Sequence, residues 1–324
     1  MKKYKKWVYY GLWIGLPICL YFVVAESMTW RPHRIGVLTS RALCLAFSRD
    51  GRTLASGDRN GDVHLWDVKA KTLLKTLKQG DSSILSIAFS QNGLYMACGG
   101  ADGKIRVWDV RSGVLLKTLS KGKGMIWSIA FFPDGRVIAS TRMSQRLTSK
   151  MELWDAKLGV LKWVSSEVKP PNSMSFSQDG KALISGDADN KVRLWSTQTG
   201  KLLRVIDGLG VVVSYAFSPD SKRFATVDNL TPNVKLWDIR TGRLLQVIKG
   251  HSGAMFLVTF SPSGKLLAAA NWDGTISVCD TSEWNLLRMI HTGEGKATAL
   301  AISPYDNTLA SSSRNRIIYL WRIA

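Results

Sequence analysis

The sequence has few of the residues from which most catalytic and metal sites are built. Its 324 residues include four histidines and four cysteines, and the cysteines show no CxxC spacing (Cys19, Cys44, Cys98 and Cys279). We interpret those in the body of the chain as small buried hydrophobic residues in strands, not as ligands or disulfides. No HExxH, GxSxG or P-loop motif is present. The sequence therefore predicts no enzyme, no catalytic residue, no cofactor and no bound metal.

Acidic residues are also in short supply. Against 44 Lys and Arg residues stand 24 Asp and Glu residues, which gives a formal net charge of +20. An excess of this size favours acidic partners, polyanions or anionic membranes, and says nothing about the fold. The basic residues are spread over many turns and form no stripe that could follow a phosphate backbone, so nucleic acid is disfavoured. Binding of a polyanion, an anionic lipid or nucleic acid is the alternative function.

One long uncharged stretch lies near the N-terminus. After the basic start MKKYKK, residues 7–25 (WVYYGLWIGLPICLYFVVA) carry no charge over nineteen residues. As a helix they would span about 28 Å, close to the hydrocarbon thickness of a bilayer. Residues 1–25 are therefore expected to form a transmembrane signal-anchor with a cytoplasmic N-terminus. A short linker over 26–33 would follow, and the rest of the chain would be extracytoplasmic.

Two alternatives stay open for this segment. Val23 and Ala25 precede Glu26 as small residues precede a signal-peptide cleavage site. Cleavage after Ala25 would leave a secreted or periplasmic protein. LPIC (16–19) is similar to a lipoprotein box, although Ile18 is large for that position.

The rest of the chain repeats. A turn motif occurs seven times: FSRDG (47–51), FSQNG (89–93), FFPDG (131–135), FSQDG (176–180), FSPDS (217–221), FSPSG (260–264) and ISPYD (302–306). A second motif follows each turn: LWD (65–67), VWD (107–109), LWD (153–155), LWS (194–196), LWD (236–238), VCD (278–280) and LWR (320–322). A period near 42 residues indicates a repeat architecture.

Each repeat has the pattern of four short antiparallel strands. In the first repeat these are ALCLAFS, TLASGD, VHLWDV and TLLKTL, apolar segments separated by Asp-Gly and Asn-Gly pairs that favour tight hairpins. A single four-stranded sheet cannot bury both of its faces, whereas seven such sheets packed in a ring can. The sequence therefore predicts an all-β protein.

With these motifs in register, residues 34–324 resemble the WD-repeat (Trp-Asp repeat) β-propeller family. The resemblance implies seven four-stranded blades, a ring closed by an N-terminal strand, and a non-catalytic, monomeric scaffold for protein partners. The last repeat has three strands and no fourth, so residues 34–38 are expected to pair beside 317–321. The family's structural positions are expected at Trp66, Trp108, Trp154, Trp195, Trp237, Trp321, Asp102, Asp189, Asp273 and His251, with His251 and Asp273 forming a partial brace.

The resemblance also implies which face binds partners. In WD-repeat relatives this is the face made by the loops entering each first strand and by the hairpins between second and third strands, called the hairpin face below. On it, the third repeat has a hairpin (141–150) four residues longer than that of the first repeat. The candidate docking residues for an acidic protein, glycan or lipid headgroup are Arg142, Arg146, Lys150, Lys121, Lys123 and Lys169.

Two aromatic residues complete the candidate site. Trp127 and Phe256 each lie four residues before a turn motif and are expected near the mouth of the central channel. Their alternative role is packing between strands, just as the basic residues could simply belong to a solvated loop. Trp127, beside the basic loop, is the favoured anchor for a partner.

Overall fold

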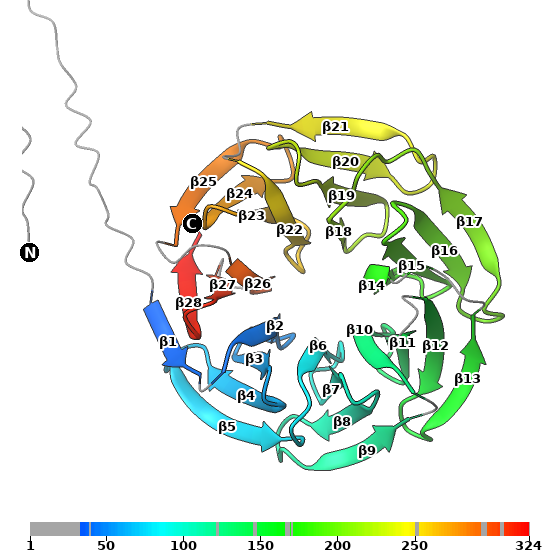
Figure 1. Ribbon diagram of the computed structural model, residues 1–324, viewed down its shortest axis with the longest axis vertical. Helices are drawn as coiled ribbons and strands as arrows, with labels where there is room; N and C mark the ends of the chain where they lie inside the picture. The colour runs from blue at the N-terminus through cyan, green and yellow to red at the C-terminus, as the bar shows by residue number, and fades with distance from the viewer. Residues whose placement is uncertain are drawn as a thin grey trace, which may run out of the picture. The chain divides into compact units, whose positions relative to one another are not determined.

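The described part of the chain, seen here in a computed structural model, forms a ring of twenty-eight strands (Figure 1). The structure describes residues 33–38, 40–120, 123–144, 148–165, 169, 171–249, 253–292, 297–304 and 308–323. These residues lie within one compact unit, Arg31–Ala324. Among them no helix is present, and the strands form seven four-stranded antiparallel sheets. The predicted all-β seven-bladed propeller is confirmed.

The blades follow one another along the chain. The first four are β2 (Ala42–Phe47), β3 (Thr53–Asp58), β4 (Asp62–Asp67) and β5 (Thr72–Lys78); β6 (Ile84–Phe89), β7 (Tyr95–Gly100), β8 (Ile105–Asp109) and β9 (Leu115–Leu119); β10 (Met125–Phe131), β11 (Val137–Met143), β12 (Ser149–Asp155) and β13 (Val160–Val164); β14 (Pro171–Phe176), β15 (Ala182–Asp187), β16 (Val192–Ser196) and β17 (Leu202–Ile206). The last three are β18 (Ser214–Phe217), β19 (Arg223–Val227), β20 (Val234–Asp238) and β21 (Leu244–Ile248); β22 (Met255–Phe260), β23 (Leu266–Asn271), β24 (Thr275–Asp280) and β25 (Leu286–His291); β26 (Ala297–Ile302), β27 (Thr308–Ser313), β28 (Ile317–Arg322) and β1 (His33–Val37). In every blade numbered one to six the first strand lies toward the channel and the fourth on the circumference (Figure 1).

The turn motif forms the same structure in successive blades. In blade one the Ser48 hydroxyl donates to the Asp50 carboxylate at 2.6 Å, and the N–H groups of Arg52 and Thr53 donate to Asp50 and Ser48. Gly51 takes the left-handed conformation (φ 65°) that reverses the chain there. These local hydrogen bonds explain why the turn motif alone predicts where each first strand ends.

The hydrophobic core lies between blades. The buried side chains form seven clusters, and each cluster combines residues from two neighbouring blades. A blade therefore buries neither face without its neighbours, which is the physical reason the repeats assemble as a ring.

The last blade is closed by the N-terminal strand. β1 pairs antiparallel with β28, with Arg34 opposite Tyr319 and Val37 opposite Ile317. Ile35 is buried against Trp66 and Ile318, at the junction of blades seven and one. The expected closure is confirmed, with a strand that begins at His33, a residue the sequence placed in the linker.

The circumference carries a second link between blades. Side chains from fourth strands donate to backbone carbonyls of the next blade, at or just after the end of its third strand. The donor–acceptor pairs are Lys75 to Ser112 at 2.5 Å, Trp163 to Thr197 at 2.9 Å, Arg204 to Arg240 and Thr241, and Arg288 to Arg322 at 3.0 Å. Part of the positive charge therefore holds neighbouring blades together.

The expected membrane location is corrected. Within the part of the chain that the structure describes, no helix is long and apolar enough to span a bilayer. The segment over 7–25, on which a single-pass protein with an extracytoplasmic propeller depended, lies outside the described residues. The predicted location is therefore withdrawn.

Candidate functional site: the hairpin face of the ring

The central channel is a cavity of about 610 Å³ surrounded by the first strands of the blades. Its lining is apolar or carries small hydroxyls, with no acidic, basic or histidine side chain among the described residues that form it. Leu43, Ser86, Trp127, Ser173, Tyr215 and Thr298 are examples. Such a lining can bind apolar groups and form hydrogen bonds through its hydroxyls.

Trp127 lies at this channel and remains accessible. It interrupts the pairing of β10 with β11, where Ile126 faces Arg142 and Ser128 faces Thr141, so Trp127 is the extra residue of a β-bulge. Its side chain is 40% exposed and contributes to the channel lining. A large aromatic side chain in this state is the type of residue that anchors protein partners.

Phe256 occupies the corresponding bulge of β22 but has a different environment. Its ring packs edge-on against Trp272, with centroids 5.6 Å apart, and it is half-buried. Trp272, on the hairpin after β23, is 49% exposed. Trp272 was not predicted as a site residue, although its position on a hairpin of the hairpin face can be read from the repeat pattern.

The structure separates the predicted basic residues into two groups. Lys123, Lys150 and Lys169 are exposed. Arg142 is 7% exposed, and its guanidinium contacts the Glu152 carboxylate at 2.7 Å. Arg142 therefore does not belong to an exposed docking surface. Lys121 and Arg146 lie outside the described residues, so their contribution stays a prediction.

Arg142 belongs instead to a series of charge contacts at equivalent positions of several blades, each with at least one buried partner in blades three, four and five. Two positions are involved in each blade. One lies two residues before the blade tryptophan in the sequence. The other lies two residues after the serine or threonine whose hydroxyl accepts the hydrogen bond of that tryptophan. They hold Arg142 and Glu152 in blade three, Asp187 and Arg193 in blade four, and Asp228 and Lys235 (3.4 Å) in blade five. In blade two Gly100 has no side chain at the first position, and Arg106 contacts Asp102 in the hairpin at 2.7 Å.

Two of the predicted structural aspartates take part in this series. Asp102 contacts Arg106, and Asp189 contacts Arg193 at 2.6 Å, so both have arginine partners. The hydrogen bond from Arg193 lowers the pKa of Asp189, whereas burial raises the pKa of Asp187 to about 6. The Asp273 carboxylate accepts the N–H of Thr275 at 2.8 Å. His251 lies outside the described residues, so the brace between His251 and Asp273 stays a prediction.

The blade tryptophans share one buried contact. Their indole N–H groups donate to a hydroxyl on the second strand at 2.8–3.2 Å: Trp66 to Ser56, Trp154 to Ser140, Trp195 to Ser185, Trp237 to Thr226 and Trp321 to Ser311. Trp108 differs, because its buried indole nitrogen has no hydrogen-bond partner among the described residues. Cys98 stands opposite Arg106, where Ser56 stands opposite His64, so a thiol replaces the hydroxyl.

Replacing Cys98 with serine is expected to stabilise the propeller, because the Trp108 indole gains a hydroxyl acceptor. A buried hydrogen bond contributes roughly 1 kcal/mol, which corresponds to a melting temperature about 2 °C higher in a protein of this size. Differential scanning calorimetry measures the shift. Cys279→Ser is the control: Cys279 occupies the tryptophan position of blade six and is fully buried, so a hydroxyl there should lower the melting temperature.

All three cysteines in the described residues are free, and Cys98 and Cys279 are buried. Burial raises the pKa of the Cys98 thiol to about 12 and that of Cys279 to about 11. The thiols therefore stay protonated near neutral pH and lie in strands as small apolar residues.

A second basic sector was missed from the sequence. Arg59 and Arg314 occupy the same hairpin position, seven residues before the tryptophans of blades one and seven, and Arg41 precedes β2 between them. Burial, and after it repulsion from Arg314 and Arg59, lowers the pKa of Arg41. An alignment of the repeats would have predicted this cluster, because residues at equivalent positions of adjacent blades are neighbours in space.

Comparison with protein-family models agrees with this architecture. The model described as the IFT122 first beta-propeller matches residues 38–231, well over half of the chain. The model of the WD domain, G-beta repeat, matches residues 242–280 and 285–322, and each match begins at the fourth strand of one blade and continues through the first three strands of the next. Together the matches extend from residue 38 to residue 322 and leave residues 232–241 and 281–284 unmatched. The chain belongs to the IFT122 first beta-propeller family and is a WD-repeat propeller of the kind that generally acts as a non-catalytic scaffold for protein partners.

Proposed function

We propose that the hairpin face of this scaffold binds an acidic segment of a protein partner at blade three. Trp127 would provide the apolar contact, and Lys123, Lys150 and Lys169 would surround it with positive charge. The observation that carries the proposal is Trp127, which is 40% exposed and contributes to the lining of a channel without charged side chains among the described residues. An exposed tryptophan supplies a large contact area, and exposed lysines of the same blade and its neighbouring loops would favour acidic sequences and fast association.

The buried contact between Arg142 and Glu152 strengthens the argument for charge. Glu152 is 3% exposed and its carboxylate is neutralised by Arg142, so it does not offset the lysines on the surface. Gly124, next to Lys123, also lies close to Arg142, whose guanidinium donates to the Gly124 carbonyl at 3.4 Å. The buried pair therefore holds the loop that carries Lys123 against the hairpin of blade three.

Selection from a displayed library of short random peptides tests the proposal. We expect the full-length protein to enrich peptides rich in Asp and Glu with one large apolar residue. Trp127→Ala should weaken a selected peptide about tenfold, a loss of about 1.4 kcal/mol. Replacing Lys123, Lys150 and Lys169 with alanine should reduce the association rate and the dependence of binding on salt.

A matched variant controls for loss of any exposed tryptophan. Trp272→Ala removes a similarly exposed indole from the hairpin side of blade six and should leave peptide affinity unchanged. Equal affinity in the wild type and Trp127→Ala would contradict the proposal, and so would enrichment of peptides without acidic residues.

A further inference from the structure

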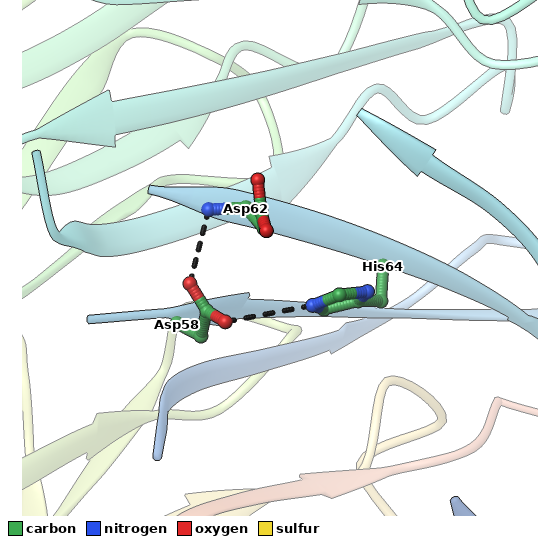
Figure 2. Close-up of side chains that lie close together, drawn as sticks. All are labelled: Asp58, Asp62 and His64. Atoms are coloured by element: carbon green, nitrogen blue, oxygen red, sulfur yellow. Dashed lines mark hydrogen bonds and ion pairs between the residues drawn. The ribbon is translucent and has the colours of Figure 1, made fainter. Parts of the chain in front are cut away.

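Blade one holds an Asp–His pair whose facing atoms do not form a hydrogen bond with one another. At the positions where blade four carries Asp187 in contact with Arg193, blade one carries Asp58 and His64. The Asp58 side chain is fully buried, and that of His64 is 9% exposed. Asp58 Oδ2 and His64 Nε2 point toward one another 3.5 Å apart, and neither makes a hydrogen bond among the described residues (Figure 2). Two buried polar atoms that face each other without a hydrogen bond are costly, and an ion bound between them would satisfy both.

The other atoms of both side chains are already held in place. Asp58 Oδ1 accepts the backbone N–H groups of Asn60 and Asp62, each at 3.0 Å. His64 Nδ1 lies 3.0 Å from the Thr76 hydroxyl. If this ring nitrogen donates its proton to Thr76, the lone pair is left on Nε2, which faces Asp58. Histidine ligands of metals are oriented in this way, by a hydrogen bond from the ring nitrogen that does not bind the metal.

A third ligand lies next to these two. Asp62 is the first residue of β4 and is half-buried. One ligand atom each of Asp58, Asp62 and His64 lies within 4.8 Å of the other two (Figure 2). Zinc binds histidine nitrogen and carboxylate oxygen at about 2.0–2.2 Å, so two ligands at a tetrahedral angle are about 3.4 Å apart. The separation of 3.5 Å between His64 Nε2 and Asp58 Oδ2 fits this value and is longer than a hydrogen bond between N and O.

We propose that Asp58, Asp62 and His64 bind a divalent transition-metal ion, best fitted by Zn²⁺, on the hairpin of blade one. Two carboxylates and one imidazole supply the oxygen and nitrogen donors that Zn²⁺ takes in proteins. Three protein ligands leave a fourth position, which the half-buried side of the site opens to water or to a ligand atom of a partner. This proposal is independent of the one for blade three.

Blade four supplies the variant that separates metal binding from folding. His64→Arg places at position 64 the side chain that already contacts an aspartate at the equivalent position of blade four. The variant should fold, close the pair with Asp58 and lose the metal ligand. Asp62→Asn removes the half-buried ligand without touching the Asp58 contacts, and His291→Gln removes a histidine of blade six as the control.

Isothermal titration of the full-length, tag-free, EDTA-treated protein with ZnCl₂ tests the site. We expect one equivalent to bind the wild type and His291→Gln, with affinity more than tenfold weaker in Asp62→Asn and abolished in His64→Arg. Zinc should raise the melting temperature of the wild type and leave that of His64→Arg unchanged. Co²⁺ in its place should give the visible absorption of a tetrahedral site. Absence of zinc binding by the wild type would overturn the proposal. Binding of zinc by Asp62→Asn and His64→Arg with the affinity of the wild type would also overturn it, because Asp58 and His64 would then only contact one another.

Discussion

Arg142→Met is expected to lower the free energy of unfolding by about 3–5 kcal/mol, the usual cost of leaving one member of a buried ion pair without its partner. The Glu152 side chain is 4% exposed, and among the described residues it would then keep the hydrogen bond from the Ser140 hydroxyl but lose its ion-pair partner. The carbonyls of Gly103 and Gly124 would also lose the Arg142 donor. Urea denaturation followed by tryptophan fluorescence measures the change, as a lower midpoint with an unchanged slope.

A double variant distinguishes a charge effect from a packing effect. Removing both charges, with Arg142→Met and Glu152→Leu together, should recover much of the lost stability, because no unpaired charge stays buried. Lys150→Ala, on the exposed face of the same blade, should change the free energy of unfolding by less than about 0.5 kcal/mol. If Arg142→Met were as stable as the wild type, Arg142 would be free to act as the docking residue that the sequence indicated.

Ile35→Ala should destabilise the ring by about 2–5 kcal/mol, the range measured for truncation of buried isoleucine and leucine. Ile35 is 5% exposed and packs at the only junction formed by strands from the two ends of the chain among the described residues. Its loss should also let β1 detach from β28 and leave an open strand edge, which favours aggregation. Thermal unfolding and light scattering on heating measure the two effects.

The neighbouring residues of β1 provide the comparisons for this prediction. Val37 lies on the same strand but is exposed, so Val37→Ala should be nearly neutral. Gly36→Ala should destabilise the same junction by overpacking, since a Cβ at Gly36 would lie 2.2 Å from the Trp66 ring. Equal stability of Ile35→Ala and Val37→Ala would show that ring closure does not depend on the packing of this strand.

Local signals were sufficient to predict the fold. The turn motif makes its own hydrogen bonds among residues within five positions of one another, as Ser48 and Asp50 do, so each copy is readable in isolation. The last repeat has no fourth strand of its own, so β28 would keep an unpaired edge unless β1 paired with it. The closing strand could therefore be predicted from the sequence. Trp127 could be placed near the channel for a similar reason, since its offset from the turn fixes its position on β10.

The candidate site was less predictable because charge alone does not indicate burial. Arg142 and Lys150 lie opposite one another in the hairpin of blade three, and both were predicted to be exposed. Arg142 is buried because Glu152, ten residues away in sequence, presents its carboxylate from the next strand. From the composition, four histidines were taken as too few for a metal site. The hairpin between β3 and β4 nevertheless brings His64 close to Asp58 and Asp62.

The sequence by itself determined the number of blades, the four strands of each, and the strand that closes the ring, because these depend on contacts within a repeat and on a period that repeats along the chain. The tertiary structure alone decided which charges are buried, which tryptophan lacks an acceptor, and where basic residues of adjacent blades gather. These properties depend on which side chains meet across strands and between blades. At equivalent positions, the longer Arg193 side chain contacts Asp187, whereas the shorter His64 side chain stops 3.5 Å from Asp58.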